Sequence, residues 1–257
     1  TASTVLTVQA AMAARWTSQS SWTTDTRRSV WGSDAKNVVA VGERGSISKW
    51  NGTLWNTPAG RTTALTGVWG SDADHVWAVS LLGDILKWDG GAWRYDLGFP
   101  MGLGGIWGTD ANQVWAVGNA GTILKWNGTT WVAQSSGTTR FLHGVWGSDA
   151  NHVWAVGEET ILKWNGTTWT EEAGATARSL YAVWGSDSNH VWAVGGSGTI
   201  LQWNGTAWND SMDELMPSPR AMAALSVPFP GAVAMGQGID GNTYSISTDL
   251  TTIGPRL

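Results

Sequence analysis

The chain has 257 residues, of which 42% are hydrophobic and 14% charged, with a formal net charge of −5 at pH 7 and no cysteine. The lack of cysteine excludes disulfides, thiolate metal sites and a thiol nucleophile, and the low charge excludes the basic field that a nucleic-acid binder needs. No apolar run approaches the roughly 20 residues of a membrane span.

The N-terminal segment, TASTVLTVQAAMAAR, starts at Thr1 and lacks the basic region of a signal peptide. We therefore expect a processed product or an excised domain. The next segment, WTSQSSWTTDTRRSVWG from Trp16, aligns without a gap with WVAQSSGTTRFLHGVWG from Trp131. Trp16 is thus expected to occupy the same structural position as Trp131.

Between about Arg28 and Met212 the sequence repeats itself five times. The repeat is marked by tryptophans at intervals of 38, 38, 39 and 38 residues, namely Trp31, Trp69, Trp107, Trp146 and Trp184. A fixed period of this length indicates an array of one small structural unit.

Each repeat contains four short strand-like runs separated by turn residues. In the copy at 105–131 they begin at GIWG, VWAVG, TILKW and TTWVAQ. Asn-Gly or Asp-Gly precedes the fourth run in every copy, which predicts a tight hairpin with a two-residue type I′ turn. Four antiparallel strands in about 38 residues are typical of a blade of a β-propeller.

Twenty of the 21 tryptophans fall into four fixed positions of the repeat, one in each strand. Because each indole can bury about 150–250 Å², we expect a core of tryptophans between blades, with sugar stacking by a subset as the alternative. One lysine precedes the third-strand tryptophan in four copies: Lys49, Lys87, Lys125 and Lys163. We expect these lysines to be solvated and to discourage edge pairing.

The C-terminal copy keeps the pattern in degraded form. Leu225 takes the first-strand tryptophan position, Val233 the second-strand position, and Tyr244 and Ile246 fall in the third strand. From Trp16 to Ile246 there are 231 residues, six repeats of 38.5. The sequence therefore predicts an all-β fold, a six-bladed β-propeller with four antiparallel strands per blade.

Its ring is expected to close by a 1+3 strand exchange, with Trp16 on the outermost strand of the last blade. The competing possibility is that residues 4–8 take the third-strand place of residues 243–247. We expect a single domain over 1–257, with blades at about 28–58, 66–97, 104–135, 143–173, 181–212, and 222–248 plus 14–19.

Two repeat families resemble parts of this chain. Trp88-Asp89-Gly90 resembles the WD dipeptide of WD-repeat propellers, although the other copies have Trp-Asn and the Gly-His element of that family is absent. The cadence GVWG…G-x-I-x-K-W, at 67–70 and 83–88, is similar to tectonin-type and related Trp-rich bacterial propeller repeats. The resemblance covers about residues 16–246 and implies a lectin or a surface-recognition protein.

Recurrent polar residues in the turns are not expected to carry chemistry. His75, His152 and His190 share one turn position that holds Asn or Gln in other copies, and equivalent positions in separate blades lie too far apart to share a metal. The aspartates of the Gly-Ser/Thr-Asp turns cap their own turns through local hydrogen bonds, with calcium as the minor alternative. We expect no metal site, no cofactor and no catalytic set, and therefore no enzyme.

The copies differ mainly just before the first strand and between the second and third strands. In a propeller these connections ring the mouth of the channel on one face, and loops on a rigid scaffold are common binding sites. We predict that the ligand-binding residues at this mouth are Arg28, Phe141, His143 and Tyr181. The alternative is a set of equivalent rim sites at Trp55, Trp93, Trp131 and Trp169.

The sequence favours a non-enzymatic recognition module with carbohydrate as its ligand, since aromatic faces stack on sugars and repeats give avidity. The alternative is a structural or protein-interaction propeller, natural or designed, without a small-molecule ligand. The expected partner is a glycan or a protein surface, with no nucleic acid and no membrane span, and the chain is expected to be a monomer.

Overall fold

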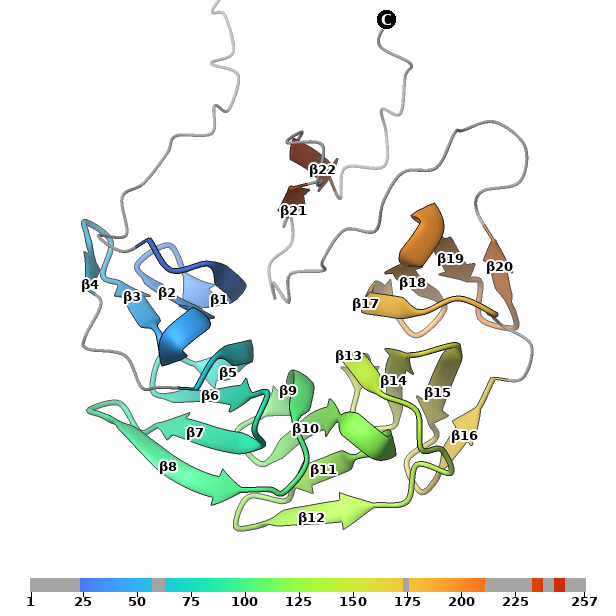
Figure 1. The fold of residues 1–257 in the computed structure, drawn as a ribbon, viewed down its shortest axis with the longest axis horizontal. Coiled ribbons are helices and arrows are strands. Elements are labelled where there is room, and N and C mark those ends of the chain that lie inside the picture. Colours follow the sequence, from blue (N-terminus) through green and yellow to red (C-terminus); the bar gives the residue numbers. More distant parts are fainter. Residues whose placement is uncertain (1–23, 57–62, 173–175, 211–232, 238–242, 248–257) are drawn as a thin grey trace, which may run out of the picture.

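The computed structural model describes residues 24–56, 63–172, 176–210, 233–237 and 243–247. In this part of the chain, five four-stranded antiparallel sheets, which we call blades 1 to 5, follow one another in sequence order. Figure 1 shows them arranged about a common centre, with β1, β5, β9, β13 and β17 innermost. The all-β propeller predicted from the repeat is therefore confirmed.

The strands of the five blades are short and follow the predicted runs. Blades 1 and 2 contain β1 (Arg27–Asp34), β2 (Asn37–Gly42), β3 (Ile47–Trp50), β4 (Trp55–Asn56), β5 (Leu65–Asp72), β6 (His75–Ser80), β7 (Asp84–Trp88) and β8 (Trp93–Gly98). Blades 3 and 4 contain β9 (Leu103–Asp110), β10 (Gln113–Gly118), β11 (Ile123–Trp126), β12 (Trp131–Gln134), β13 (Leu142–Asp149), β14 (His152–Gly157), β15 (Thr160–Trp164) and β16 (Trp169–Glu171). Blade 5 contains β17 (Leu180–Asp187), β18 (His190–Gly195), β19 (Ile200–Trp203) and β20 (Trp208–Asp210).

Three short 3-10 helices connect second to third strands: η1 (Glu43–Gly45), η2 (Asn119–Gly121) and η3 (Gly196–Gly198). Beyond blade 5, β21 (Val233–Gln237) pairs antiparallel with β22 (Thr243–Ser247), which agrees with their predicted places as second and third strands of a last copy. Trp16, Leu225 and residues 4–8 lie outside the described residues. The sixth blade and its closure by strand exchange therefore stay predictions.

Tryptophans form the core between blades, as expected. Trp69, Trp77, Trp107, Trp115, Trp146 and Trp154 are all buried. Within a blade the first- and second-strand indoles stack, with ring centroids 5.7 Å apart for Trp107 and Trp115. In blade 5 the equivalent Trp184 and Trp192 are only half-buried, because no described blade covers the far face of that sheet.

The glycine of the repeated Trp-Gly sequence is explained by the neighbouring blade. A Cβ atom on Gly108 would lie 2.7 Å from Cη2 of Trp69, the first-strand tryptophan of the blade before it. The same approach is 2.8 Å between Gly147 and Trp107. Each first-strand indole therefore reaches across the blade boundary into space that only a glycine leaves open.

The prediction for the third-strand lysines was wrong. Lys87 Nζ lies 5.0 Å from the ring centroid of Trp77 in its own blade and 4.7 Å from that of Trp126 in the next blade. Lys125 lies likewise between Trp115 and Trp164, and burial lowers its pKa. The third strand is an inner strand covered by the next blade, so its lysine forms cation–π contacts across the blade boundary instead of guarding an edge.

The hairpin between third and fourth strands is confirmed, but its turn type is not. In blade 3 the strands pair at Trp126 and Trp131, so four residues connect them. Gly128 has a φ of +96° whereas Asn127 has no positive φ, which excludes a type I′ turn. The Asn127 side chain instead accepts hydrogen bonds from the backbone N–H groups of Thr129 and Thr130, at 3.0 and 2.9 Å. These hydrogen bonds to the asparagine side chain favour the four-residue connection over the predicted two-residue turn.

Candidate functional site on the loop face

Hydrogen bonds show which of the connections between strands lie on the same face of the molecule. The loop after each second strand binds the segment that enters the first strand: Asn119 N donates to Gly102 O at 2.8 Å, and Glu158 N donates to Phe141 O at 2.9 Å. We call this side the loop face. On the opposite side, the turn face, the Trp126 indole donates to Ala111 O in the first turn of its blade, at 3.0 Å. The two variable sets of connections thus share one face, as the sequence predicts.

Three of the four residues predicted to bind a ligand form one aromatic cluster on the loop face. Phe141 immediately precedes β13, His143 lies in β13 and Tyr181 lies in β17. The ring centroids are 4.3 Å apart for Phe141 and His143, and 5.2 Å apart for His143 and Tyr181. His143 belongs to blade 4 and Tyr181 to blade 5, so the cluster joins these two blades. Because Tyr181 exposes 46% of its surface, the cluster also faces solvent.

A carboxylate adjoins this aromatic cluster. Glu158 Oε2 accepts a hydrogen bond from the Phe141 backbone N–H at 3.4 Å. Burial lowers the pKa of His143, while the charge of Glu158 acts in the opposite direction. The imidazole is therefore neutral at pH 7, and the cluster presents aromatic surface beside a negative charge.

Arg28, the fourth predicted residue, lies apart from the cluster. It belongs to β1 in blade 1, and its Nη2 is 3.2 Å from Glu43 Oε1 in an exposed ion pair. Exposed pairs of this kind contribute little to stability. The structure therefore does not bring Arg28 into contact with the three aromatic residues.

A second apolar group on the loop face was not assigned to the site from sequence. Leu81 and Leu82, in the loop between β6 and β7, are exposed, Leu82 at 70%, and Met101 before β9 is exposed as well. The two loops touch, since a Cβ on Gly83 would lie 2.6 Å from Met101 O. The signal was present in the sequence, where Leu-Leu stands at the position of Glu43-Arg44, Asn119-Ala120 and Glu158-Glu159 in other copies.

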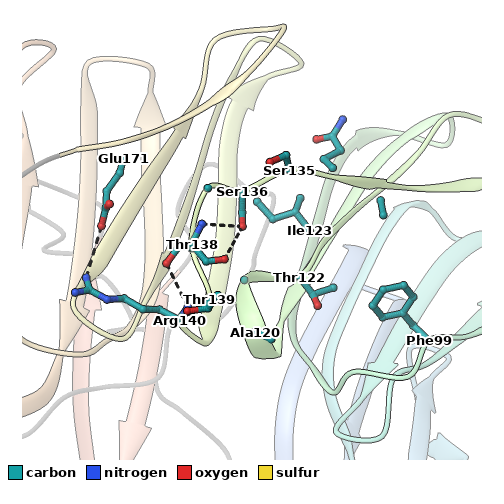
Figure 2. Close-up of a pocket in the computed structure, with 14 residues that line it drawn as sticks. Phe99, Ala120, Thr122, Ile123, Ser135, Ser136, Thr138, Thr139, Arg140 and Glu171 are labelled. Atoms are coloured by element: carbon teal, nitrogen blue, oxygen red, sulfur yellow. Dashed lines mark hydrogen bonds and ion pairs between the residues drawn. The ribbon is translucent and has the colours of Figure 1, made fainter.

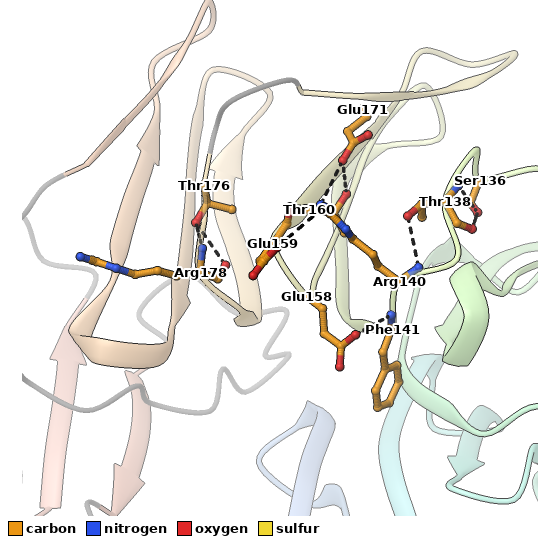
Figure 3. A network of polar contacts seen from close by, with 10 residues as sticks. All are labelled: Ser136, Thr138, Arg140, Phe141, Glu158, Glu159, Thr160, Glu171, Thr176 and Arg178. Carbon is orange, nitrogen blue, oxygen red and sulfur yellow. Dashed lines mark hydrogen bonds and ion pairs between the residues drawn. The ribbon is translucent and has the colours of Figure 1, made fainter.

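A groove of about 670 Å³ lies along the loop that leads from β12 to β13, with Phe99, Ile123 and Ser136 among its lining residues (Figure 2). Ser136 is buried, and its hydroxyl accepts a hydrogen bond from Thr138 N at 3.3 Å. At one end, Arg140 lies 3.6 Å from Glu171 and 3.8 Å from Glu159 (Figure 3). These groups bind one another, and Arg140 directly precedes Phe141 of the aromatic cluster.

The alternative rim tryptophans are held by packing and hydrogen bonds. Each contacts the third-strand tryptophan of its blade, with ring centroids 5.6–5.9 Å apart for Trp55, Trp93, Trp131 and Trp169. The indoles also link neighbouring blades: Trp131 donates to Asp96 at 2.8 Å and Trp169 to Gln134 at 2.9 Å. These contacts leave less ring surface for sugar stacking, and the rim sites stay a prediction.

The polar turn residues serve their own turns. Asp149 Oδ1 accepts from the backbone N–H groups of Asn151 and His152, at 2.8 and 3.1 Å, and His152 Nδ1 lies 2.8 Å from the same carboxylate. Blades 2 and 5 repeat the histidine–aspartate pair. In the described part of the chain, no three potential metal-binding side chains lie together. Nor does any of its helices have the length and apolar character to span a membrane.

Comparisons with known proteins support the propeller fold. No family model and no curated protein sequence matches the chain. The solved structures that resemble it include the computationally designed Ika8 protein, 21% identical over 86% of this chain and 70% of that one, with a TM-score of 0.65. The WD40 β-propeller domain of Doa1 is 13% identical over 86% and 75%, with a TM-score of 0.64.

A third similar structure, YCF48 bound to D1 peptide, is 17% identical over 74% of this chain and 83% of that one, with a TM-score of 0.52. At these identities the similarity shows a repeat propeller and nothing finer. Similarity to tectonin-type repeats stays a prediction.

Proposed function

We propose that this protein is a non-enzymatic protein-interaction module that binds a peptide segment of its partner on the loop face. The observation that carries the proposal is the solvent-facing cluster of Phe141, His143 and Tyr181. With Leu81, Leu82 and Met101 it forms apolar surface on one face of the ring. Exposed apolar groups gathered on one face are typical of protein-binding surfaces.

The charge beside the cluster defines the chemistry of the partner. Glu158 adjoins the aromatic cluster, whereas Glu159, which follows it in the same loop, lies 3.8 Å from Arg140. A lysine or arginine of the partner could stack on Tyr181 while pairing with Glu158. The expected partner segment therefore combines apolar side chains with at least one basic residue. The structure of YCF48 with a peptide supports peptide binding as a use of this fold.

Carbohydrate, which the sequence favours, receives less support than a protein partner. The rim indoles that would stack on sugars are packed against third-strand tryptophans and, in two blades, hydrogen-bonded across the blade boundary. The solved structures similar to this chain include a peptide complex. Glycan binding is therefore an outcome to be tested against peptide binding.

The proposal is tested by selecting a random 12-residue phage-displayed peptide library on the intact protein, with a glycan array in parallel. We expect selected peptides that contain apolar and basic residues. Tyr181→Ala should weaken binding of a selected peptide about tenfold, the scale of a modest hot spot. Tyr95→Ala is the matched control, since Tyr95 is similarly exposed but lies on the outer strand β8. Glycan binding alone, or equal effects of the two variants, would overturn the proposal.

A further inference from the structure

A second cavity lies on the opposite side of the ring from the loop face. Its volume is about 630 Å³, and it is lined by residues of the innermost strands and of the turns that follow them. Each of the five blades contributes its first-strand tryptophan to the lining: Trp31, Trp69, Trp107, Trp146 and Trp184. Volumes of this size are typical of small-molecule sites.

The first-strand indoles of blades 3, 4 and 5 form one aromatic row. Ring centroids of neighbouring blades are 6.3 Å apart for Trp107 and Trp146, and 6.5 Å apart for Trp146 and Trp184. Trp31 is 2% exposed, and its indole N–H donates to no described residue. A ligand with an oxygen atom could accept a hydrogen bond from this buried donor.

The polar part of the lining is acidic. Asp110 and Asp149 both line the cavity, and no lysine or arginine of the described residues does. Asp110 accepts hydrogen bonds from Asn112 N at 2.7 Å and from the Thr109 hydroxyl at 2.9 Å, but no basic side chain of the described chain pairs with it. Its negative charge is therefore not neutralised by a neighbour.

We propose that this turn-face cavity binds a small organic cation, of the quaternary ammonium class. Indole rings attract such cations through the negative potential of their faces. The two carboxylates add Coulombic attraction, and of the two Asp110 has no basic partner among the described residues, whereas Asp149 lies 2.8 Å from His152. An anion would be repelled by both carboxylates. The site is built from repeated residues of five blades and does not depend on the function proposed for the loop face.

The test compares two probes of equal shape, choline and 3,3-dimethylbutan-1-ol, in which carbon replaces the charged nitrogen. Both carry the hydroxyl oxygen that could accept from Trp31. Binding is measured on the full chain by titration calorimetry and saturation-transfer NMR. We expect choline to bind with a Kd near 1 mM, and the neutral probe roughly tenfold more weakly.

Two double variants locate the site. Asp110→Asn with Asp149→Asn removes the charge at the cavity while retaining side chains that can cap a turn. Asp34→Asn with Asp72→Asn makes the same change at equivalent turns whose aspartates do not line the cavity. We expect the first variant to weaken choline binding at least fivefold and the second to leave it unchanged, with circular dichroism showing that both fold.

Three results would overturn the proposal. The first is equal binding of choline and its neutral analogue, which would show an apolar cavity without preference for charge. The second is no binding of choline up to 50-fold above the expected Kd. The third is choline binding that the cavity variant does not change, which would place the cation elsewhere.

Discussion

The repeated Trp-Gly pair forms contacts between neighbouring blades. The tryptophan of one blade fills space beside the glycine of the next, and the glycine of its own pair receives the tryptophan of the blade before. The tryptophan and the glycine of one pair therefore make their contacts with two different neighbouring blades. The dipeptide recurs because every inner blade both gives and receives this contact.

Gly108→Ala tests the cost of filling that space. Its Cβ would lie 2.7 Å from Trp69 Cη2 and 2.6 Å from Gln113 O, so a backbone atom and a buried ring would have to move. We expect a loss of about 1–3 kcal/mol in the free energy of unfolding, measured by urea denaturation. Gly91→Ala is the control, because its nearest neighbour is Asp89 Oδ1 at 3.6 Å. Equal losses in both variants would contradict the explanation.

The stability lost when a second-strand tryptophan is replaced by alanine should differ between blades. Trp115→Ala removes a fully buried ring and is expected to cost about 3–5 kcal/mol. Trp192→Ala, at the equivalent position of blade 5, should cost less because its ring is only half-buried by the described chain. Thermal and urea unfolding measure both. A larger loss for Trp192 would mean that the C-terminal segment buries it completely.

At the level of elements, strands were predictable and turn geometry was not. Apolar runs such as VWAV mark strands because in the inner blades they are covered on both sides, and the equivalent run is a strand in each of the five blades. The turn after Asn127 was predicted wrongly because the asparagine side chain caps a four-residue loop, a choice that Asn-Gly alone does not reveal. Lys87 was misassigned because sequence does not show that a neighbouring blade covers the third strand.

The candidate site was predictable only in part. Phe141, His143 and Tyr181 were selected from the sequence because they vary beside a constant Trp-Gly, and the structure places them together. The turn-face cavity was not found, because it is built from the residues that repeat, and a search for differences between copies passes over them. The contact between the loop of Leu81 and Leu82 and the loop of Met101 could not be predicted, because it depends on how two separate loops lie in three dimensions.

The aspartate turns predict a pH dependence of stability. Hydrogen bonds from Asn189 N and His190 lower the pKa of Asp187, and the pKa values of Asp34, Asp72 and Asp149 are lowered too. A carboxyl with a lowered folded-state pKa stabilises the fold above its unfolded pKa near 4, and this contribution is lost as pH falls further.

We therefore expect the urea midpoint of the parent to fall between pH 5 and pH 2. The variant with asparagine at all four positions should show a shallower fall, because asparagine caps the turn without titrating. The difference between the two proteins should be greatest above pH 5 and smallest near pH 2. Parallel pH profiles would mean that other carboxyls control acid unfolding.

At the scale of the molecule, the residues that join neighbouring blades are not all repeated at the C-terminal end. The lysine–tryptophan contacts run from Lys49 to Lys163, and in blade 5 the lysine position is Gln202. The chain has no tryptophan after Trp208. A sixth blade built from the C-terminal segment would therefore join its neighbours by weaker contacts than those within blades 1 to 5.

An engineered disulfide tests the predicted closure. Val233 pairs with Ser247 in the last hairpin, and Lys125 pairs with Trp115 on one side and Val132 on the other in blade 3. By the same register, Thr17 should lie opposite Ser247. Thr17→Cys with Ser247→Cys should form an intramolecular disulfide, detected by mobility on non-reducing gels and mass spectrometry, with no native cysteine to compete.

The control pairs Thr17→Cys with Val233→Cys, which the same register places two strands apart, beyond the Cα separation that a disulfide can bridge. A bond in the control, or none in the first variant, would contradict the 1+3 closure. A disulfide-linked dimer in the first variant would indicate that two chains exchange the strand.

The Trp-Gly contact gives every blade a direction, because one side of the sheet projects an indole and the other side accepts one. Such an interface is heterologous, so it ends only when the rotation between units brings the last acceptor back to the first donor. Blade number is then set by the angle between sheets, and the same contact could join blades of different chains into an open fibre. The C-terminal segment contains no tryptophan and breaks this succession. A sixth repeat of the Trp-Gly type in its place would present an indole that either the first blade or another molecule could accept.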